Sequence, residues 1–182
     1  MKTMTTLAGL LLCAAALADN ITQNHEAGAP YVDRGATALD SYDLDCTARI
    51  VATGIAGVTP NMLGTYTVIY NVTDLSGNAA DPTVRTVIVK DTRPPVITLK
   101  GAAILTVPRG TPALSIPGIG ATALDSFSGA CTVTAVSVPA LDTTKAGIYV
   151  ITFAAKDSSG NPATPVTQTV KVMGKPVITI NP

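Results

Sequence analysis

The feature that most restricts the fold of this chain is a tandem repeat. Residues 35–40, Gly-Ala-Thr-Ala-Leu-Asp, occur again without change at residues 120–125, which lie 85 residues later. Two further matches follow at a spacing of 83 residues: Gly-x-Tyr begins at Gly64 and Gly147, and Asp-x-Ser-Gly-Asn begins at Asp74 and Asp157. Near-constant spacing over most of the chain indicates a duplication, so we expect two units with the same fold.

Both repeats place apolar residues at every second position of one segment. These residues are Tyr66, Val68, Tyr70 and Val72 in the first repeat and Tyr149, Ile151, Phe153 and Ala155 in the second. A period of two predicts strands with one buried face, and turn sequences such as Ser76-Gly77-Asn78 separate them. The predicted fold class is therefore all-β, with two tandem immunoglobulin-like antiparallel β-sandwiches. Tyr66 and Tyr149 each begin a strand, where we expect the ring to pack and the hydroxyl to bond to the backbone.

The N-terminal residues have the pattern of a secretory signal peptide. Lys2 precedes an apolar run over residues 7–16, and Ala16-Leu17-Ala18 forms a cleavage site before Asp19. We therefore expect a signal peptide at 1–18, with retention as an apolar strand left open, and a secreted, extracellular or cell-surface protein that meets a membrane only during secretion. The predicted domains are 19–92 and 93–174, followed by a C-terminal strand at 175–182.

The two predicted sandwiches differ in how they begin. The second opens with Pro-Val-Ile-Thr-Leu at 95–99 and continues with a strand at about 103–107. The first begins around Ile21 and reaches Tyr31 too early to hold both strands. A near copy of the opener, Pro-Val-Ile-Thr-Ile, stands at 176–180. We therefore expect a first sandwich that lacks an edge strand and a C-terminal strand that is spare.

These motifs together resemble a known family. Ala-Thr-Ala-Leu-Asp, Gly-x-Tyr-x-Val/Ile, Asp-x-Ser-Gly-Asn and the Pro-Pro-Val-Ile-Thr-Leu opener are similar to the bacterial immunoglobulin-like repeats of secreted proteins, and to the related hyalin repeats, over nearly all of residues 31–180. The resemblance implies spacers, adhesive stalks or assembly units. In the hyalin type, a cysteine after the acidic turn pairs with one in the last strand. Cys46 and Cys131 match the first position and the second is absent, so that bridge is not carried over.

The mismatch of strands suggests assembly. An incomplete sheet exposes unpaired backbone groups, and a spare strand from another copy could pair with them. We expect a structural subunit of a pilus-like or fimbrial extracellular filament that polymerises head to tail with itself. The acceptor is predicted at the edge from Ile21 to Tyr31. The predicted donor strand contains Pro176, Val177, Ile178, Thr179 and Ile180. Cys46 and Cys131 are either small core residues or partners in a disulfide between subunits.

Two alternative hypotheses about the function remain open. The chain could be a monomeric adhesin stalk or a carbohydrate-binding module, with a surface glycan or host molecule as its ligand. It could also be part of a longer repeat array in which Lys175 begins a third unit. The balance of 12 basic and 12 acidic residues gives no reason to expect nucleic acid as a partner.

Few residues suggest chemistry. Asp40, Asp43 and Asp45 crowd one turn and could supply oxygen ligands to Ca²⁺, although solvated turn carboxylates are the simpler interpretation. The second repeat keeps only Asp125 at these positions. His25 is the one histidine, and no Cys-x-x-Cys, phosphate-binding glycine loop or nucleophile elbow occurs. We therefore expect no enzymatic activity and, calcium aside, no cofactor.

Overall fold

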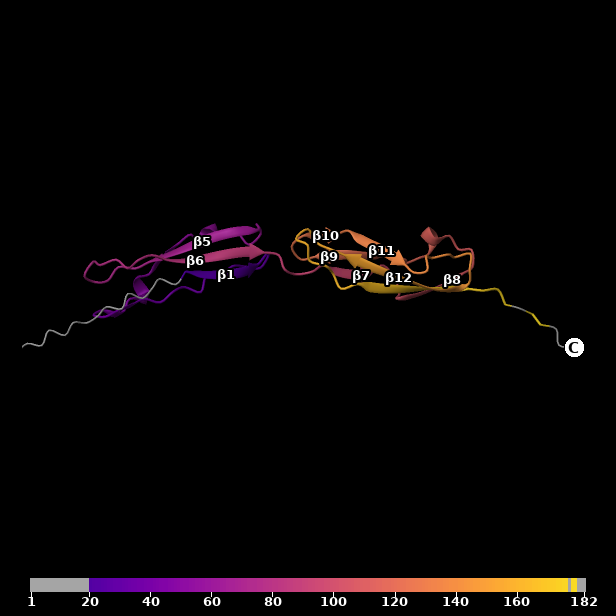
Figure 1. The fold of residues 1–182 in the computed structure, drawn as a ribbon, viewed down its shortest axis with the longest axis horizontal. Helices are drawn as coiled ribbons and strands as arrows, with labels where there is room; N and C mark the ends of the chain where they lie inside the picture. The colour runs from indigo at the N-terminus through magenta and orange to yellow at the C-terminus, as the bar shows by residue number, and fades with distance from the viewer. Residues whose placement is uncertain (1–19, 177, 180–182) are drawn as a thin grey trace, which may run out of the picture. The chain divides into compact units, whose positions relative to one another are not determined.

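The protein folds as two compact units that divide between Lys90 and Asp91 (Figure 1). The computed structural model describes residues 20–176, 178 and 179. The division lies two residues before the predicted boundary, and the predicted signal peptide lies outside the described residues. Over the described ranges the chain forms strands and three short 3-10 turns, and no helix long and apolar enough to cross a membrane.

The second unit is a β-sandwich of two sheets. One sheet has the order β10-β9-β7; its strands are β7 (Val96–Leu99), β9 (Ala121–Asp125) and β10 (Gly129–Cys131). The other has the order β11-β12-β13-β8; its strands are β8 (Ile104–Pro108), β11 (Val133–Ser137), β12 (Gly147–Ala155) and β13 (Val166–Met173). A 3-10 turn, η3 (Ala113–Ser115), lies between β8 and β9.

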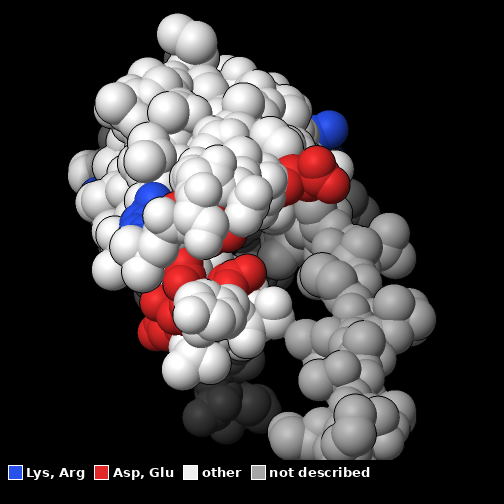
Figure 2. Space-filling view, turned by 90° about the vertical axis from the view of Figure 1, so that its left-hand side faces the viewer, with Lys and Arg blue, Asp and Glu red and all other residues white. Residues whose placement is uncertain are grey.

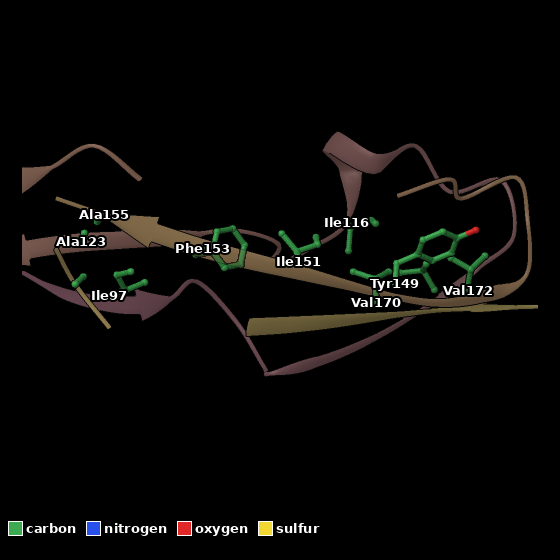
Figure 3. Packing of buried hydrophobic residues seen from close by; sticks show 11 residues of the cluster. Ile97, Ile116, Ala123, Tyr149, Ile151, Phe153, Ala155, Val170 and Val172 are labelled. Atoms are coloured by element: carbon green, nitrogen blue, oxygen red, sulfur yellow. The ribbon is translucent and has the colours of Figure 1, made fainter. Parts of the chain in front are cut away.

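The core of the second unit fills the space between these sheets (Figure 3). Alternate residues of β12 point inward, as the sequence predicted, and are joined by two residues of β13, by Ile97 from β7 and by Ala123 from β9. The residues from β12 and β13 are Tyr149, Ile151, Phe153, Ala155, Val170 and Val172. Both sheets therefore contribute apolar side chains to one core, which is the arrangement that stabilises a sandwich.

The first unit repeats this plan with one difference. Its larger sheet has the order β1-β6-β5-β4; the strands are β1 (Ile21–Glu26), β4 (Val51–Thr53), β5 (Gly64–Asn71) and β6 (Thr83–Lys90). The smaller sheet holds only β2 (Leu39–Asp40) and β3 (Leu44–Asp45). Two 3-10 turns follow β3 and β4, at η1 (Thr47–Arg49) and η2 (Ile55–Gly57).

Strand pairing identifies the counterparts. β1 runs parallel to β6, as β8 runs parallel to β13, so β1 corresponds to β8. In the same way β2 corresponds to β9 and β3 to β10. Among residues 20–90, no strand corresponds to β7.

Two features refine the sequence prediction. The sandwiches are antiparallel except for β1 with β6 and β8 with β13, which are parallel. The predicted backbone bonds of the two tyrosines are confirmed: the Tyr66 hydroxyl donates to the Met62 carbonyl at 2.8 Å, and the Tyr149 hydroxyl donates to the Lys145 carbonyl at 3.2 Å. The Tyr149 ring packs in the core, whereas Tyr66 is only half-buried.

Candidate strand-acceptor site

The smaller sheet of the first unit has an open edge beside β2. In the second unit β9 lies between β10 and β7, and β7 pairs with it antiparallel, with Ile97 opposite Ala123 and Leu99 opposite Ala121. Residues 36–39 have the same sequence as residues 121–124. Within the described part of the first unit, β2 pairs only with β3. The side of residues 36–39 that corresponds to β7 is therefore available for a strand.

The burial of the two equivalent alanines, Ala38 and Ala123, differs between the units in the same way as the strand pairing. Ala123 lies under the sandwich and is 5% exposed, with Ile97 of β7 packed in the same core. Ala38, its counterpart, is only half-buried. Leu39 and Leu124 are both exposed because they lie on the outer face of the sheet. Without a β7 counterpart among residues 20–90, the inward-facing alanine is thus less buried, and the outward-facing leucine is exposed in both units.

A hollow of about 230 Å³ lies beside the open edge. Ala36 and Thr37 line it from the segment that leads into β2, Ile21 lines it from β1, and Tyr70 and Val84 line it from β5 and β6. Phe153, the counterpart of Tyr70, belongs to the same core cluster as Ile97 in the second unit. The hollow therefore adjoins the surface that β7 would cover.

A largely buried ion pair holds the segment before this edge. The Arg85 guanidinium pairs with Asp33 and donates from its second nitrogen to the Gly35 carbonyl at 2.7 Å. Asp33 also accepts from the Tyr70 hydroxyl at 2.6 Å and from the Tyr31 hydroxyl at 3.1 Å. Burial alone would raise the pKa of Asp33, but these hydroxyl donors, the Gly35 N–H and the Arg85 charge hold that pKa below its usual value. The carboxylate therefore stays charged and fixes residues 33–35 against β6.

In the second unit a side-chain amide holds the corresponding segment before β9. Gln168 holds the position of Arg85 in the repeat and is fully buried. Its side-chain nitrogen donates to the carbonyls of Ala102 and Gly118, both at 2.9 Å, and its oxygen accepts from Gly120 N–H at 3.0 Å. Ala102 lies between β7 and β8. The bond from Gln168 to Ala102 therefore depends on the connection between β7 and β8. Residues 20–90 contain a counterpart of β8 but none of β7.

The predicted acceptor residues border this site without forming its open edge. Ile21 begins β1, an edge strand that pairs with β6 on one side just as β8 pairs with β13, and its side chain lines the hollow. The ring of Tyr31 packs perpendicular to the ring of His25, and its hydroxyl donates to Asp33. The structure places the unpaired edge at residues 36–39, which the sequence prediction did not name. The exact repeat of residues 35–40 was the signal that could have located it.

The predicted donor segment is described only in part. Pro176, Ile178 and Thr179 are exposed and lie in no strand, and the side chain of Ile178 is 91% exposed. Val177 and Ile180 lie outside the described residues. In β7 the position of Ile178 is held by Ile97, which is 9% exposed. Ile178 is thus an apolar side chain without the cover that its counterpart has.

Both described cysteines are free thiols within their own units. Cys46 is 5% exposed and Cys131 is half-buried. Burial raises the pKa of both thiols, and nearby carboxylates add to the effect at Cys131. A buried thiol with a raised pKa is a poor nucleophile, so these positions favour a core role, and the bridge between subunits stays a prediction.

The acidic turn of the first unit is occupied by backbone hydrogen bonds. Figure 2 shows acidic side chains gathered on the end of this unit that faces the viewer. Asp40 accepts from the N–H groups of Tyr42 and Asp43, both at 2.8 Å, and these bonds lower its pKa. Asp43 accepts from Leu75 N–H at 2.6 Å, and Asp45 accepts from Thr47 N–H at 2.9 Å.

The predicted calcium ligands therefore do not converge. In the described ranges, the one group of three side chains with metal-binding atoms close together is Asp91, Asp125 and Asp157 in the second unit. Asp125 and Asp157 hold the places of Asp40 and Asp74 in the repeat, which was the available signal. Asp91 was not predicted, because it comes from a segment far away in the sequence.

Comparison with known sequences supports the repeat. Residues 16–89 and 97–172 each match the family described as "Bacterial surface protein, Ig-like domain". The chain is also 34% identical over 155 residues to hyalin from Lytechinus variegatus and 30% identical over 156 residues to hyalin from Strongylocentrotus purpuratus. These alignments cover 84% and 85% of the chain. The chain spans only 29% and 13% of the length of the two hyalins.

The matches among solved structures have low sequence identity and low TM-scores. A crystal structure of human protocadherin-24 EC1-2 is 16% identical, with 87% of this chain and 97% of that chain covered and a TM-score of 0.43. A lipoprotein from Bacteroides thetaiotaomicron is also 16% identical, with 85% and 76% covered and a TM-score of 0.33.

Proposed function

The chain belongs to the bacterial surface protein Ig-like domain family, and we propose that it is a non-enzymatic structural module at or beyond the cell surface. The fold supports a structural role, because the described residues form two small sandwiches whose polar groups mostly serve turns and strand pairing.

We further propose that copies of this chain join head to tail. Residues 176–180 of one copy would enter beside residues 36–39 of the next and add the β7-like strand that is absent among residues 20–90. Transfer of the β7–β9 register places Ile178 opposite Ala38 and Thr179 opposite Thr37. The contact joins different surfaces of the two copies, so repetition would build a filament.

The expected energies make this a weak contact for a single strand. Two or three buried aliphatic side chains contribute roughly 4–8 kcal/mol, and each backbone hydrogen bond adds about 0.5–1.5 kcal/mol. Loss of translational and rotational freedom costs about 4–15 kcal/mol. Because these quantities nearly balance, we expect filament growth to need a high local concentration or further contacts between neighbouring copies.

The observation that carries the proposal is the absence of a β7 counterpart among residues 20–90, in a chain that has a second copy of the β7 sequence. Ile178→Asp tests it, because the equivalent Ile97 is buried in β7. Val177→Asp is the matched control, because the equivalent Val96 is 68% exposed. Light scattering and electron microscopy of the purified protein should show assemblies for the wild type and Val177→Asp, and monomers for Ile178→Asp.

Other outcomes point to other functions. Monomers for all three proteins would contradict assembly and favour a binding module that works alone. In a longer protein, residues 176–180 pairing within their own chain to a further repeat would favour an extended array. The matched hyalins are several times longer than this chain, and this length supports testing the hypothesis that the chain is part of an extended array.

A further inference from the structure

Three aspartates meet at one end of the second unit. Asp91 is the first residue of this unit and precedes β7, Asp125 ends β9, and Asp157 begins the turn after β12. All three are buried, with exposed fractions of 6%, 4% and 7%. One carboxylate oxygen from each lies within 4.8 Å of the corresponding oxygens of the other two. Segments that are distant in the sequence therefore bring three acidic groups together.

Turn hydrogen bonds satisfy only part of this cluster. Oδ1 of Asp125 accepts from the N–H groups of Phe127 and Ser128 at 2.8 and 2.7 Å. Oδ2 of Asp125 is buried and has no hydrogen-bond partner. Asp157 accepts from the backbone and side-chain nitrogens of Asn161, both at 2.8 Å. The turn fold of Asp125 thus uses one oxygen and leaves the other without a partner in the interior.

Asp91 is held in place by hydroxyl groups. Its Oδ2 accepts from Ser159 Oγ at 2.9 Å and from Ser128 Oγ at 3.4 Å. Its backbone carbonyl accepts from the Asn161 amide at 3.2 Å. The segment that leads into β7 is therefore already positioned against both turns, and the two hydroxyl oxygens lie beside the carboxylates.

The described residues give these three carboxylates no partner within ion-pair distance. No ion pair seen among residues 20–176, 178 and 179 includes any of the three aspartates. Buried like charges without a counter-ion are unfavourable, and a buried oxygen without a partner requires an explanation.

We propose that Asp91, Asp125 and Asp157 bind one divalent cation, with Ca²⁺ preferred. All the candidate ligands are oxygens, which suit hard cations. Ca²⁺ binds oxygen at about 2.3–2.6 Å, so two ligands of one ion can lie up to about 5 Å apart, whereas Mg²⁺ at about 2.0–2.1 Å requires a tighter group. Ser128, Ser159 and water can complete the six to eight ligands that Ca²⁺ takes.

The cation would join three segments of the second unit: the residues before β7, the end of β9 and the turn after β12. The first unit has Asp40 and Asp74 in the places of Asp125 and Asp157, but its described residues contain no third carboxylate in the place of Asp91. We therefore expect one site per chain. This inference is independent of strand donation, since none of its ligands lies in residues 36–39 or 176–180.

Calcium titration of the full chain tests the proposal. After removal of metal with EDTA, calorimetry with CaCl2 should show one site per chain, and Ca²⁺ should raise the melting temperature of the second unit. Asp125→Asn keeps an oxygen for the turn and removes the charge. It should weaken Ca²⁺ binding at least about tenfold. In EDTA it should melt no lower than the wild type, because one of three like charges is gone.

Asp40→Asn is the matched control, since it makes the same change at the equivalent turn of the first unit and should leave Ca²⁺ binding unchanged. The proposal is overturned if the wild type gives neither heat nor a melting shift with CaCl2. It is also overturned if Asp125→Asn binds Ca²⁺ as the wild type does, or if Asp125→Asn is destabilised equally in EDTA and in Ca²⁺. Asp91→Asn provides a second variant should Asp125→Asn fail to fold.

Discussion

The same six residues fold differently in the two units. Gly-Ala-Thr-Ala-Leu-Asp at 120–125 contributes all of β9, a strand of five residues, whereas the identical sequence at 35–40 forms only the two residues of β2. The inward-facing alanine is covered in one case and half-buried in the other. Since the local sequence is identical, the difference comes from the neighbour: β9 has β7 beside it. For these six residues, pairing with a neighbouring strand decides the length of the strand more than the intrinsic β-propensity of the sequence does.

The two units also differ in what holds the residues before this strand. The first uses the largely buried ion pair of Asp33 and Arg85, whereas the second uses the fully buried amide of Gln168. A charged pair requires both partners, because either one alone leaves a buried charge. The amide bonds instead to backbone carbonyls that stay in place. The first unit should therefore be the more easily broken at this position.

Asp33→Ala should cause the largest change in stability among these predictions, and only in the first unit. Loss of the carboxylate leaves Arg85 buried without its partner, and we expect the first unit to lose about 3–5 kcal/mol. Hydrogen exchange with mass spectrometry should show faster exchange in β5 and β6 and no change in β12 and β13. The double variant Asp33→Gly with Arg85→Gln copies the second unit and should recover part of the loss. A double variant no more stable than Asp33→Ala would show that the amide needs β7 to work.

Ile97→Ala should have the next largest effect, in the second unit. Ile97 is buried between the sheets, and removing its side chain should cost about 2–4 kcal/mol. Val96→Ala, on the exposed face of the same strand, should change stability by less than about 0.5 kcal/mol. Denaturant unfolding gives both values. Equal losses for the two variants would mean that β7 is not packed through Ile97.

The smallest effect is expected when a separate peptide supplies the strand that has no counterpart among residues 20–90. A peptide with the sequence of residues 175–182 should slow hydrogen exchange at residues 36–39 and shift their amide NMR signals. Because the expected energies nearly balance, binding should be weak and visible only at high peptide concentration. A peptide with Ile178→Asp is the control and should have no effect. Protection at β1 in place of residues 36–39 would move the acceptor back to the edge beginning at Ile21.

Much of the architecture followed from the sequence alone. The spacing of the repeats, the period of two and the turn motifs predicted two all-β units. The comparison of residues 95–99 with the start of the first repeat predicted an absent strand. These features are local or repeated, so a pattern of side chains reveals them directly.

Tertiary structure decided what depends on contacts between distant segments. The sequence pattern shows which residues of a strand face inward, but it does not specify which strand lies beside it. For that reason the edge that differs between the two units lies at residues 36–39, whereas β1, which begins at Ile21, is an edge strand in the first unit as β8 is in the second. Asp91 joins Asp125 and Asp157 for the same reason, since only the folded sandwich brings the three segments to one end. Their shared burial, and the oxygen of Asp125 left without a partner, exist only once that packing has formed.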